Sequence, residues 1–124
     1  MEKDLAYNDI TRQIIESAFE IYNILGFGLK EKVYQRAMAK AFDSKKIVYT
    51  KEQYGKIIFQ GAIVGRYFID FLVDSKIAVE LKVRNELYNQ DIVQLLNYLK
   101  SKNLRVGLLI AFTNKGVKLK RIVN

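Results

Sequence analysis

The sequence contains no cysteine and no histidine. A chain without cysteine forms no disulfide, offers no thiol nucleophile and builds no cysteine zinc site. A chain without histidine lacks the usual base at neutral pH and the commonest ligand of transition metals. Any catalysis or metal binding must therefore use carboxylates, amides, hydroxyls and amines, and oxygen ligands favour magnesium, manganese or calcium.

Long hydrophobic runs are also missing, and no stretch approaches the length of a membrane span. The start, Met-Glu-Lys-Asp-Leu, shows neither a basic leader nor a long apolar core. We therefore expect a soluble, cytoplasmic protein without a membrane partner. The length of 124 residues suits one domain, residues 1–124, that is large enough to bury a core.

Positive charge is abundant, because 21 lysines and arginines face 13 aspartates and glutamates, a net charge of +8. Such an excess favours a polyanionic partner, nucleic acid first and an anionic membrane second. A membrane-surface protein needs an amphipathic cationic helix, whereas these cations are spread over predicted strands and loops. Many small basic proteins bind nothing specific, so charge alone does not assign a function.

Hydrophobic periodicity predicts two helices, a β-meander, a third helix and further strands. The first helix is capped by Asn8 or Asp9 and stops at Gly26, and the second runs from about Lys30 to Lys46. The third predicted helix covers residues 88–102, and the predicted strands are 47–54, 56–60, 66–73, 77–83, 105–112 and an edge strand, 117–123. This order predicts an α/β fold with a mixed sheet flanked by helices.

Two carboxylates and an amine lie inside two otherwise apolar predicted strands, at Asp70, Glu80 and Lys82. A three-residue turn at 74–76 would place Asp70 directly opposite Glu80, whereas a two-residue turn would send them to opposite faces. Lys82 shares a face with Glu80. Buried carboxylates need a cation or each other, and a divalent metal would meet that need.

The segment Gly28-Leu-Lys-Glu31-Lys-Val-Tyr34 resembles the signature of the GxxExxY family, within the PD-(D/E)XK nuclease superfamily. The resemblance covers nearly the whole chain, continuing through Asp70, Glu80-Leu-Lys82, Gln94-Leu-Leu-Asn-Tyr98-Leu, Val106-Gly-Leu-Leu-Ile and Lys120-Arg-Ile-Val. It departs at Gln90-Asp91, where many relatives carry a histidine. The resemblance implies a restriction-endonuclease-like PD-(D/E)XK core.

The resemblance also implies a site that holds Mg²⁺ or Mn²⁺. Its metal ligands would be Asp70, Glu80, the backbone carbonyl of Leu81 and Glu31, with Lys82 and Gln94 completing the catalytic set. Lys82 would orient the attacking water or stabilise the transition state, and Gln94 would orient a water, because an amide cannot act as a base. Each has a structural alternative: a salt bridge for Lys82, a helix-dipole contact for Glu31 and solvation for Gln94.

The predicted function is a metal-dependent nuclease that hydrolyses phosphodiester bonds, with DNA favoured as substrate. The alternative is a module that keeps the nuclease fold and binds nucleic acid or a partner without cleaving. A core this small can also gain a second binding surface by forming a homodimer. The predicted nucleic-acid contacts are Tyr98, Lys100, Arg84, Lys120 and Arg121, within a wider set of basic candidates: Lys51, Lys56, Arg66, Lys102, Arg105, Lys115 and Lys118.

Overall fold

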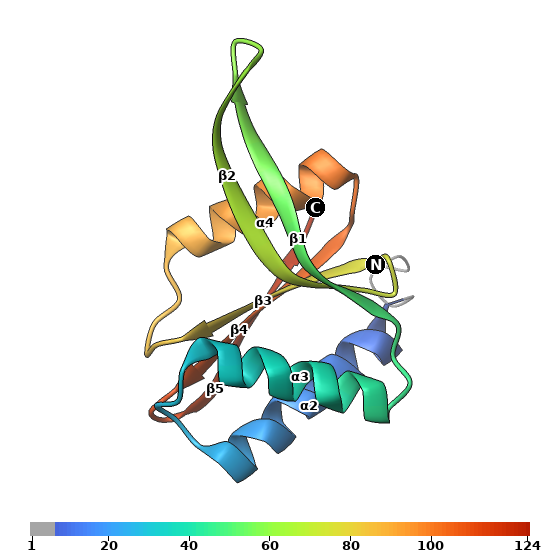
Figure 1. Cartoon of the computed structure of the whole chain (residues 1–124), viewed down its shortest axis with the longest axis vertical. Coiled ribbons are helices and arrows are strands. Elements are labelled where there is room, and N and C mark those ends of the chain that lie inside the picture. Colours follow the sequence, from blue (N-terminus) through green and yellow to red (C-terminus); the bar gives the residue numbers. More distant parts are fainter. Residues whose placement is uncertain (1–6) are drawn as a thin grey trace.

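A mixed five-stranded sheet with helices on both faces makes up the computed structural model, which describes residues 7–124 (Figure 1). Its elements in chain order are α2 (Asn8–Leu25), α3 (Glu31–Ser44), β1 (Tyr49–Phe59), β2 (Ala62–Val73), β3 (Ile77–Val83), α4 (Asn89–Lys102), β4 (Val106–Thr113) and β5 (Gly116–Val123). The predicted α/β class is confirmed. The predicted domain of residues 1–124 includes six residues that lie outside the described part.

The strands are ordered β1-β2-β3-β4-β5, and only β3 and β4 are parallel. Parallel neighbours need a crossover connection, and α4 provides it on one face of the sheet. Helices α2 and α3 cover the other face (Figure 1). Each face has its own buried cluster, and β4 is buried along its whole length, as its continuous apolar run predicts. Within residues 7–124 no helix combines the length and apolarity that crossing a bilayer requires.

The predicted break between strands 47–54 and 56–60 is wrong, because β1 runs through Gly55 without interruption. The Tyr67 ring lies over this glycine, and a side chain at that position would meet ring atoms within 2.8 Å. The actual turn is at Gln60 and Gly61, which both have positive φ and join β1 to β2. The predicted strand 66–73 is accordingly the second half of a longer strand.

The predicted side-chain cap of the first helix is also wrong. Helix α2 starts after Tyr7, and no side chain caps it. Asn8 instead accepts a hydrogen bond from the Arg121 guanidinium at 3.0 Å, and Asp9 pairs with Arg12 on the helix surface. The predicted stop at Gly26 is confirmed, since its N–H donates to the Tyr22 carbonyl at 2.8 Å.

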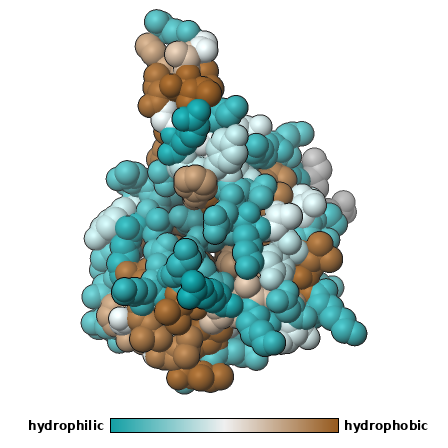
Figure 2. Space-filling view, in the orientation of Figure 1, coloured by the Kyte–Doolittle hydropathy of each residue, from teal (hydrophilic) through white to brown (hydrophobic). Residues whose placement is uncertain are grey.

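The outer part of the β1–β2 hairpin projects beyond the body of the protein, and we call its residues 54–68 the arm (Figure 1). Large apolar side chains are exposed along it, and the space-filling view shows them gathered toward the tip (Figure 2). Phe59, Val64 and Phe68 are each at least 60% exposed.

Candidate metal and nuclease site

Asp70 on β2 and Glu80 on β3 lie side by side at the point where the two strands stop pairing. The three-residue turn at 74–76 pairs Val73 with Ile77, as predicted, and the last ladder pair is Phe71 with Val79. The next step in this register sets Asp70 opposite Glu80. There, carboxylates replace the backbone ladder: the Asp70 N–H donates to Glu80 Oε1 at 3.2 Å, and the Leu81 N–H donates to Asp70 Oδ2 at 2.7 Å.

Lys82 joins this pair from the same strand as Glu80. Its Nζ lies 3.2 Å from Glu80 Oε2, and both side chains are largely buried, with 20% and 12% of their surface exposed. Residues two apart on a strand share a face, which explains the contact. Two acids and an ammonium therefore converge from neighbouring strands, as the sequence predicts.

Ionisation of both carboxyl groups is unfavourable at this position. Burial, together with the negative charge of Asp70, raises the pKa of Glu80 to about 8, and burial also raises the pKa of Asp70. Two acids this close in a poorly solvated position cannot both ionise freely, and Lys82 offsets only part of the repulsion. The pair therefore has the electrostatics of a site that a further positive charge would stabilise.

Glu31, the first residue of α3, faces this pair from the opposite layer. Burial raises its pKa, and the negative charge of Asp70 raises it further. It makes no direct contact with Asp70 or Glu80, and within residues 7–124 no three acidic side chains lie close enough to hold a metal ion together. The structure brings two of the predicted acids into contact and places the third within electrostatic reach.

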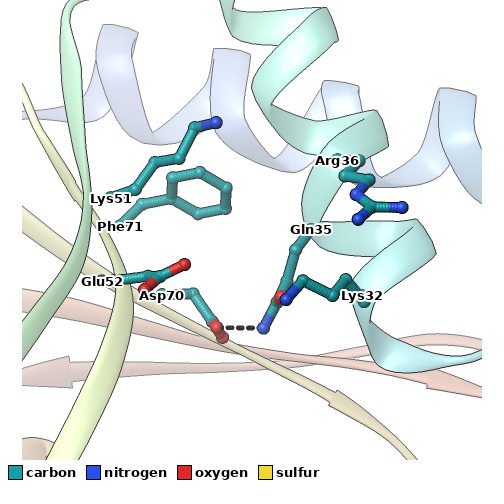
Figure 3. Close-up of a pocket in the computed structure, with 7 residues that line it drawn as sticks. All are labelled: Lys32, Gln35, Arg36, Lys51, Glu52, Asp70 and Phe71. Atoms are coloured by element: carbon teal, nitrogen blue, oxygen red, sulfur yellow. Dashed lines mark hydrogen bonds between the residues drawn. The ribbon is translucent and has the colours of Figure 1, made fainter.

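Two polar residues that the sequence does not single out line the same cavity as Asp70. Gln35 lies one turn after Glu31 on α3, and its Nε2 donates to Asp70 Oδ1 at 2.5 Å (Figure 3). Glu52 lies across from Asp70 in the β1–β2 register, and its φ of 52° is unusual for a residue with a side chain. The spacing from Glu31 to Gln35 was the available signal, because residues four apart share a helix face.

These residues line a cavity of about 100 Å³ between α3 and the β1–β2 hairpin (Figure 3). Its lining combines three basic side chains, two carboxylates, an amide and a ring: Lys32, Arg36, Lys51, Glu52, Asp70, Gln35 and Phe71. Among the described residues, none is a hydrogen-bond or ion-pair partner for the three basic side chains. The cavity beside Asp70 therefore has positively charged side chains that are available to bind an anionic group.

Comparison with known proteins assigns this chain to a family. The family model described as PD-(D/E)XK nuclease superfamily matches residues 8–122. The chain belongs to the PD-(D/E)XK nuclease superfamily. No curated protein matches the chain. A solved structure titled "Crystal structure of SSO0001" is similar in fold, with a TM-score of 0.59, 16% sequence identity and 98% of this chain covered. The chain spans 61% of the length of that structure's chain.

Nucleases of the PD-(D/E)XK superfamily use divalent cations. The donors in this structure fit such an ion, because Asp70 and Glu80 are hard oxygen ligands from adjacent strands, and the single Lys82 ammonium does not prevent the rise in the pKa of both carboxyls. Both Asp70 oxygens already accept hydrogen bonds, from Gln35 and from the Leu81 N–H. An ion held here would therefore share Asp70 with these two donors.

One predicted nucleic-acid contact of this PD-(D/E)XK protein needs correction. Tyr98 is only 1% exposed and packs edge-on against Tyr67, with ring centroids 6.3 Å apart. A side chain this deeply buried has no surface for a base or a phosphate. Tyr98 therefore belongs to the core between α4 and the sheet.

Arg84 is engaged within the protein. Its guanidinium pairs with the Asp91 carboxylate and lies 4.7 Å from the ring centroid of Tyr88. Asp91 also accepts the Tyr88 N–H at 2.9 Å, at the start of α4. These contacts stabilise the conformation of the β3–α4 loop. Contact between Arg84 and nucleic acid stays a prediction.

The remaining predicted residues are dispersed. Lys100 is exposed on α4, and Lys120 is exposed on β5. Arg121 on β5 donates to Asn8, and Gln94 on α4 is partly buried. Among the described residues, no hydrogen bond or ion pair joins Lys100, Lys120 or Gln94 to Asp70 or Glu80. The roles of these four predicted residues, and that of the Leu81 carbonyl, stay predictions.

Proposed function

We propose that this PD-(D/E)XK protein is a metal-dependent nuclease that hydrolyses phosphodiester bonds in nucleic acid, with DNA favoured. The supporting observation is the convergence of Asp70 and Glu80 from adjacent strands with the Lys82 ammonium 3.2 Å from Glu80. Asp70 and Glu80 would hold Mg²⁺ or Mn²⁺, with Glu31 and the Leu81 carbonyl as further ligands. We infer a cytoplasmic protein, and a homodimer is compatible with the proposal.

The residues divide the chemistry between them. When bound, the cation would supply a polarised water and relieve charge on the non-bridging phosphate oxygens. Lys82, fixed beside Glu80, would orient the attacking water or donate to a phosphate oxygen as negative charge develops there. Gln35 would hold the Asp70 carboxylate in one orientation through its hydrogen bond. Hydrolysis breaks one P–O bond, adds water across it and leaves a hydroxyl and a phosphate monoester.

Nuclease activity is tested with purified protein, Mg²⁺ or Mn²⁺ and single- and double-stranded substrates. We expect cleavage by the wild type, no cleavage in EDTA, and a loss of about 10²-fold or more in Asp70→Asn and Lys82→Ala. The matched control is Asp74→Asn, which makes the same change at an exposed turn four residues later. Equal activity in all variants would show a contaminating nuclease, and cleavage in EDTA would refute the metal-dependent mechanism.

A second candidate is a nucleic-acid-binding module that keeps the fold without cleaving. The observation that favours it is that both Asp70 oxygens accept hydrogen bonds from protein donors while Glu31 stays out of contact. Salt-sensitive binding of oligonucleotides with no product under any metal would support it.

A further inference from the structure

Two cross-strand residue pairs form a row on the arm, and the row leads inward to the candidate site. The register pairs Lys56 with Arg66 and Tyr54 with Phe68, and Asp70 follows Phe68 by two residues on β2. Opposed residues share a face, and so do residues two apart along a strand. The Tyr54 and Phe68 rings confirm this, because their centroids are 6.3 Å apart.

The β2 half of the row, Arg66 and Phe68, projects from the face of the arm that α4 does not cover. On β1, Tyr54 and Lys56 lie near the end of α4, where they line a cavity with Ser101 and Lys102. Tyr67 lies between Arg66 and Phe68 in β2 and packs on the α4 side against Tyr98. Because side chains alternate along a strand, Arg66 and Phe68 point the other way. At its inner end the row reaches Asp70, which bonds Gln35 of α3 and borders the cavity with the basic side chains Lys32, Arg36 and Lys51.

On the arm, the rings of this row are exposed and its cations have no hydrogen-bond or ion-pair partner among the described residues. Phe68 is 64% exposed and Tyr54 is 46% exposed. The Lys56 and Arg66 side chains are exposed, and no hydrogen bond or ion pair joins either of them to another described residue. Two exposed rings beside free cations are what single-stranded nucleic acid requires, because its bases stack on aromatic faces while its phosphates contact lysine and arginine.

We propose that this row is a binding track for single-stranded nucleic acid, with bases stacked on Phe68 and Tyr54 and phosphates held by Lys56 and Arg66. This inference deepens the proposed function, because it names the form of the substrate and the path by which it reaches Asp70. A duplex keeps its bases stacked on one another and cannot offer them to the rings. A second copy of the chain fits this face less well, because it would bring the same cations together.

The test measures binding of fluorescent oligonucleotides by anisotropy in EDTA, so that cleavage plays no part. The probes are a single-stranded oligodeoxynucleotide, the oligoribonucleotide of the same sequence and the blunt DNA duplex of the same length. We expect the wild type to bind a single strand more tightly than the duplex. Phe68→Ala should weaken single-strand binding about 5- to 150-fold, the usual effect of losing one stacked base.

The matched control is Phe59→Ala, which removes the same side chain from the same arm at a position 62% exposed and outside the row. It should leave binding unchanged. The double variant Lys56→Gln/Arg66→Gln should weaken every complex and reduce the slope of log K against log salt by about 1.4 for a single strand. Thermal unfolding of each variant should match the wild type, because all four side chains are exposed.

The two proposals fail in different ways. A protein that never cleaves but loses single-strand binding in Phe68→Ala supports the track and refutes the nuclease. Cleavage with unchanged binding in Phe68→Ala supports the nuclease and overturns the track. Duplex binding as tight as single-strand binding also overturns it. So does a dimer in sedimentation that Phe68→Ala and Phe59→Ala dissociate alike, since the arm would then be a dimer surface.

Discussion

At the scale of single residues, the central feature is a pair of carboxylates placed where a sheet would otherwise form backbone hydrogen bonds. The Asp70 and Leu81 N–H groups donate to carboxylate oxygens, so neither of these two backbone donors is left unsatisfied. The resulting crowding of charge keeps Glu80 partly protonated near neutral pH, with its pKa raised to about 8 by burial and by Asp70. Stability and metal binding are therefore linked through the same side chain.

The free energy of unfolding should fall as pH rises between about 4.5 and 8 when metal is absent. The ordinary glutamate pKa is 4.5, so across this window the unfolded chain loses the Glu80 proton while the folded protein keeps it. Glu80→Gln should remove this slope and be more stable than wild type at pH 8 by roughly 1–3 kcal/mol. Urea unfolding in EDTA at several pH values measures both.

Glu86→Gln is the matched control, because its carboxylate is exposed in the β3–α4 loop. It should keep the wild-type slope. Adding Mg²⁺ at pH 8 should stabilise wild type and leave Glu80→Gln unchanged. An identical pH slope in wild type and Glu80→Gln would contradict the raised pKa.

At the scale of elements, the β3–α4 loop is fastened by Asp91. Burial acts to raise the pKa of this carboxyl, but hydrogen bonds from Arg84 and the Tyr88 N–H outweigh it and lower the pKa. Asp91 is 7% exposed, so its loss would leave the Arg84 guanidinium and a helix N–H without their partner.

Asp91→Ala should destabilise the protein by about 1–3 kcal/mol, because it removes both a cap of α4 and a buried ion pair. Asp9→Ala provides the comparison, since Asp9 pairs with Arg12 at the exposed start of α2. Its effect should stay within about 0.5 kcal/mol. Urea denaturation of both variants at pH 7 checks the difference, and equal effects would show that the loop clamp contributes nothing.

The sequence predicts the features that depend on local pattern and misses those that depend on packing between elements. The odd-length turn at 74–76 follows from the need of two carboxylates to share a face, and the structure has it. Gly55 suggests a strand break by its type alone, whereas its role is to admit the ring of Tyr67, its partner on the neighbouring strand. The left-handed backbone of Glu52 and the bond from Gln35 to Asp70 likewise depend on packing between elements, which local pattern does not report.

At the scale of the whole molecule, one helix, a pair of strands and a hairpin meet at one position. Helix α3 contributes Glu31 and Gln35, the strand pair β2–β3 contributes Asp70, Glu80 and Lys82, and the arm extends outward from the same hairpin. The chain as a whole carries a net charge of +8, which favours approach of a polyanion. The functional proposal thus depends on the junction holding a cation.

Isothermal titration calorimetry with Mn²⁺ at pH 8 tests that claim most directly. We predict one binding site in the wild type, no measurable binding in Asp70→Asn or Glu80→Gln, and wild-type binding in Asp74→Asn. Equal Mn²⁺ affinity in all four proteins, or no binding to the wild type, would contradict the account.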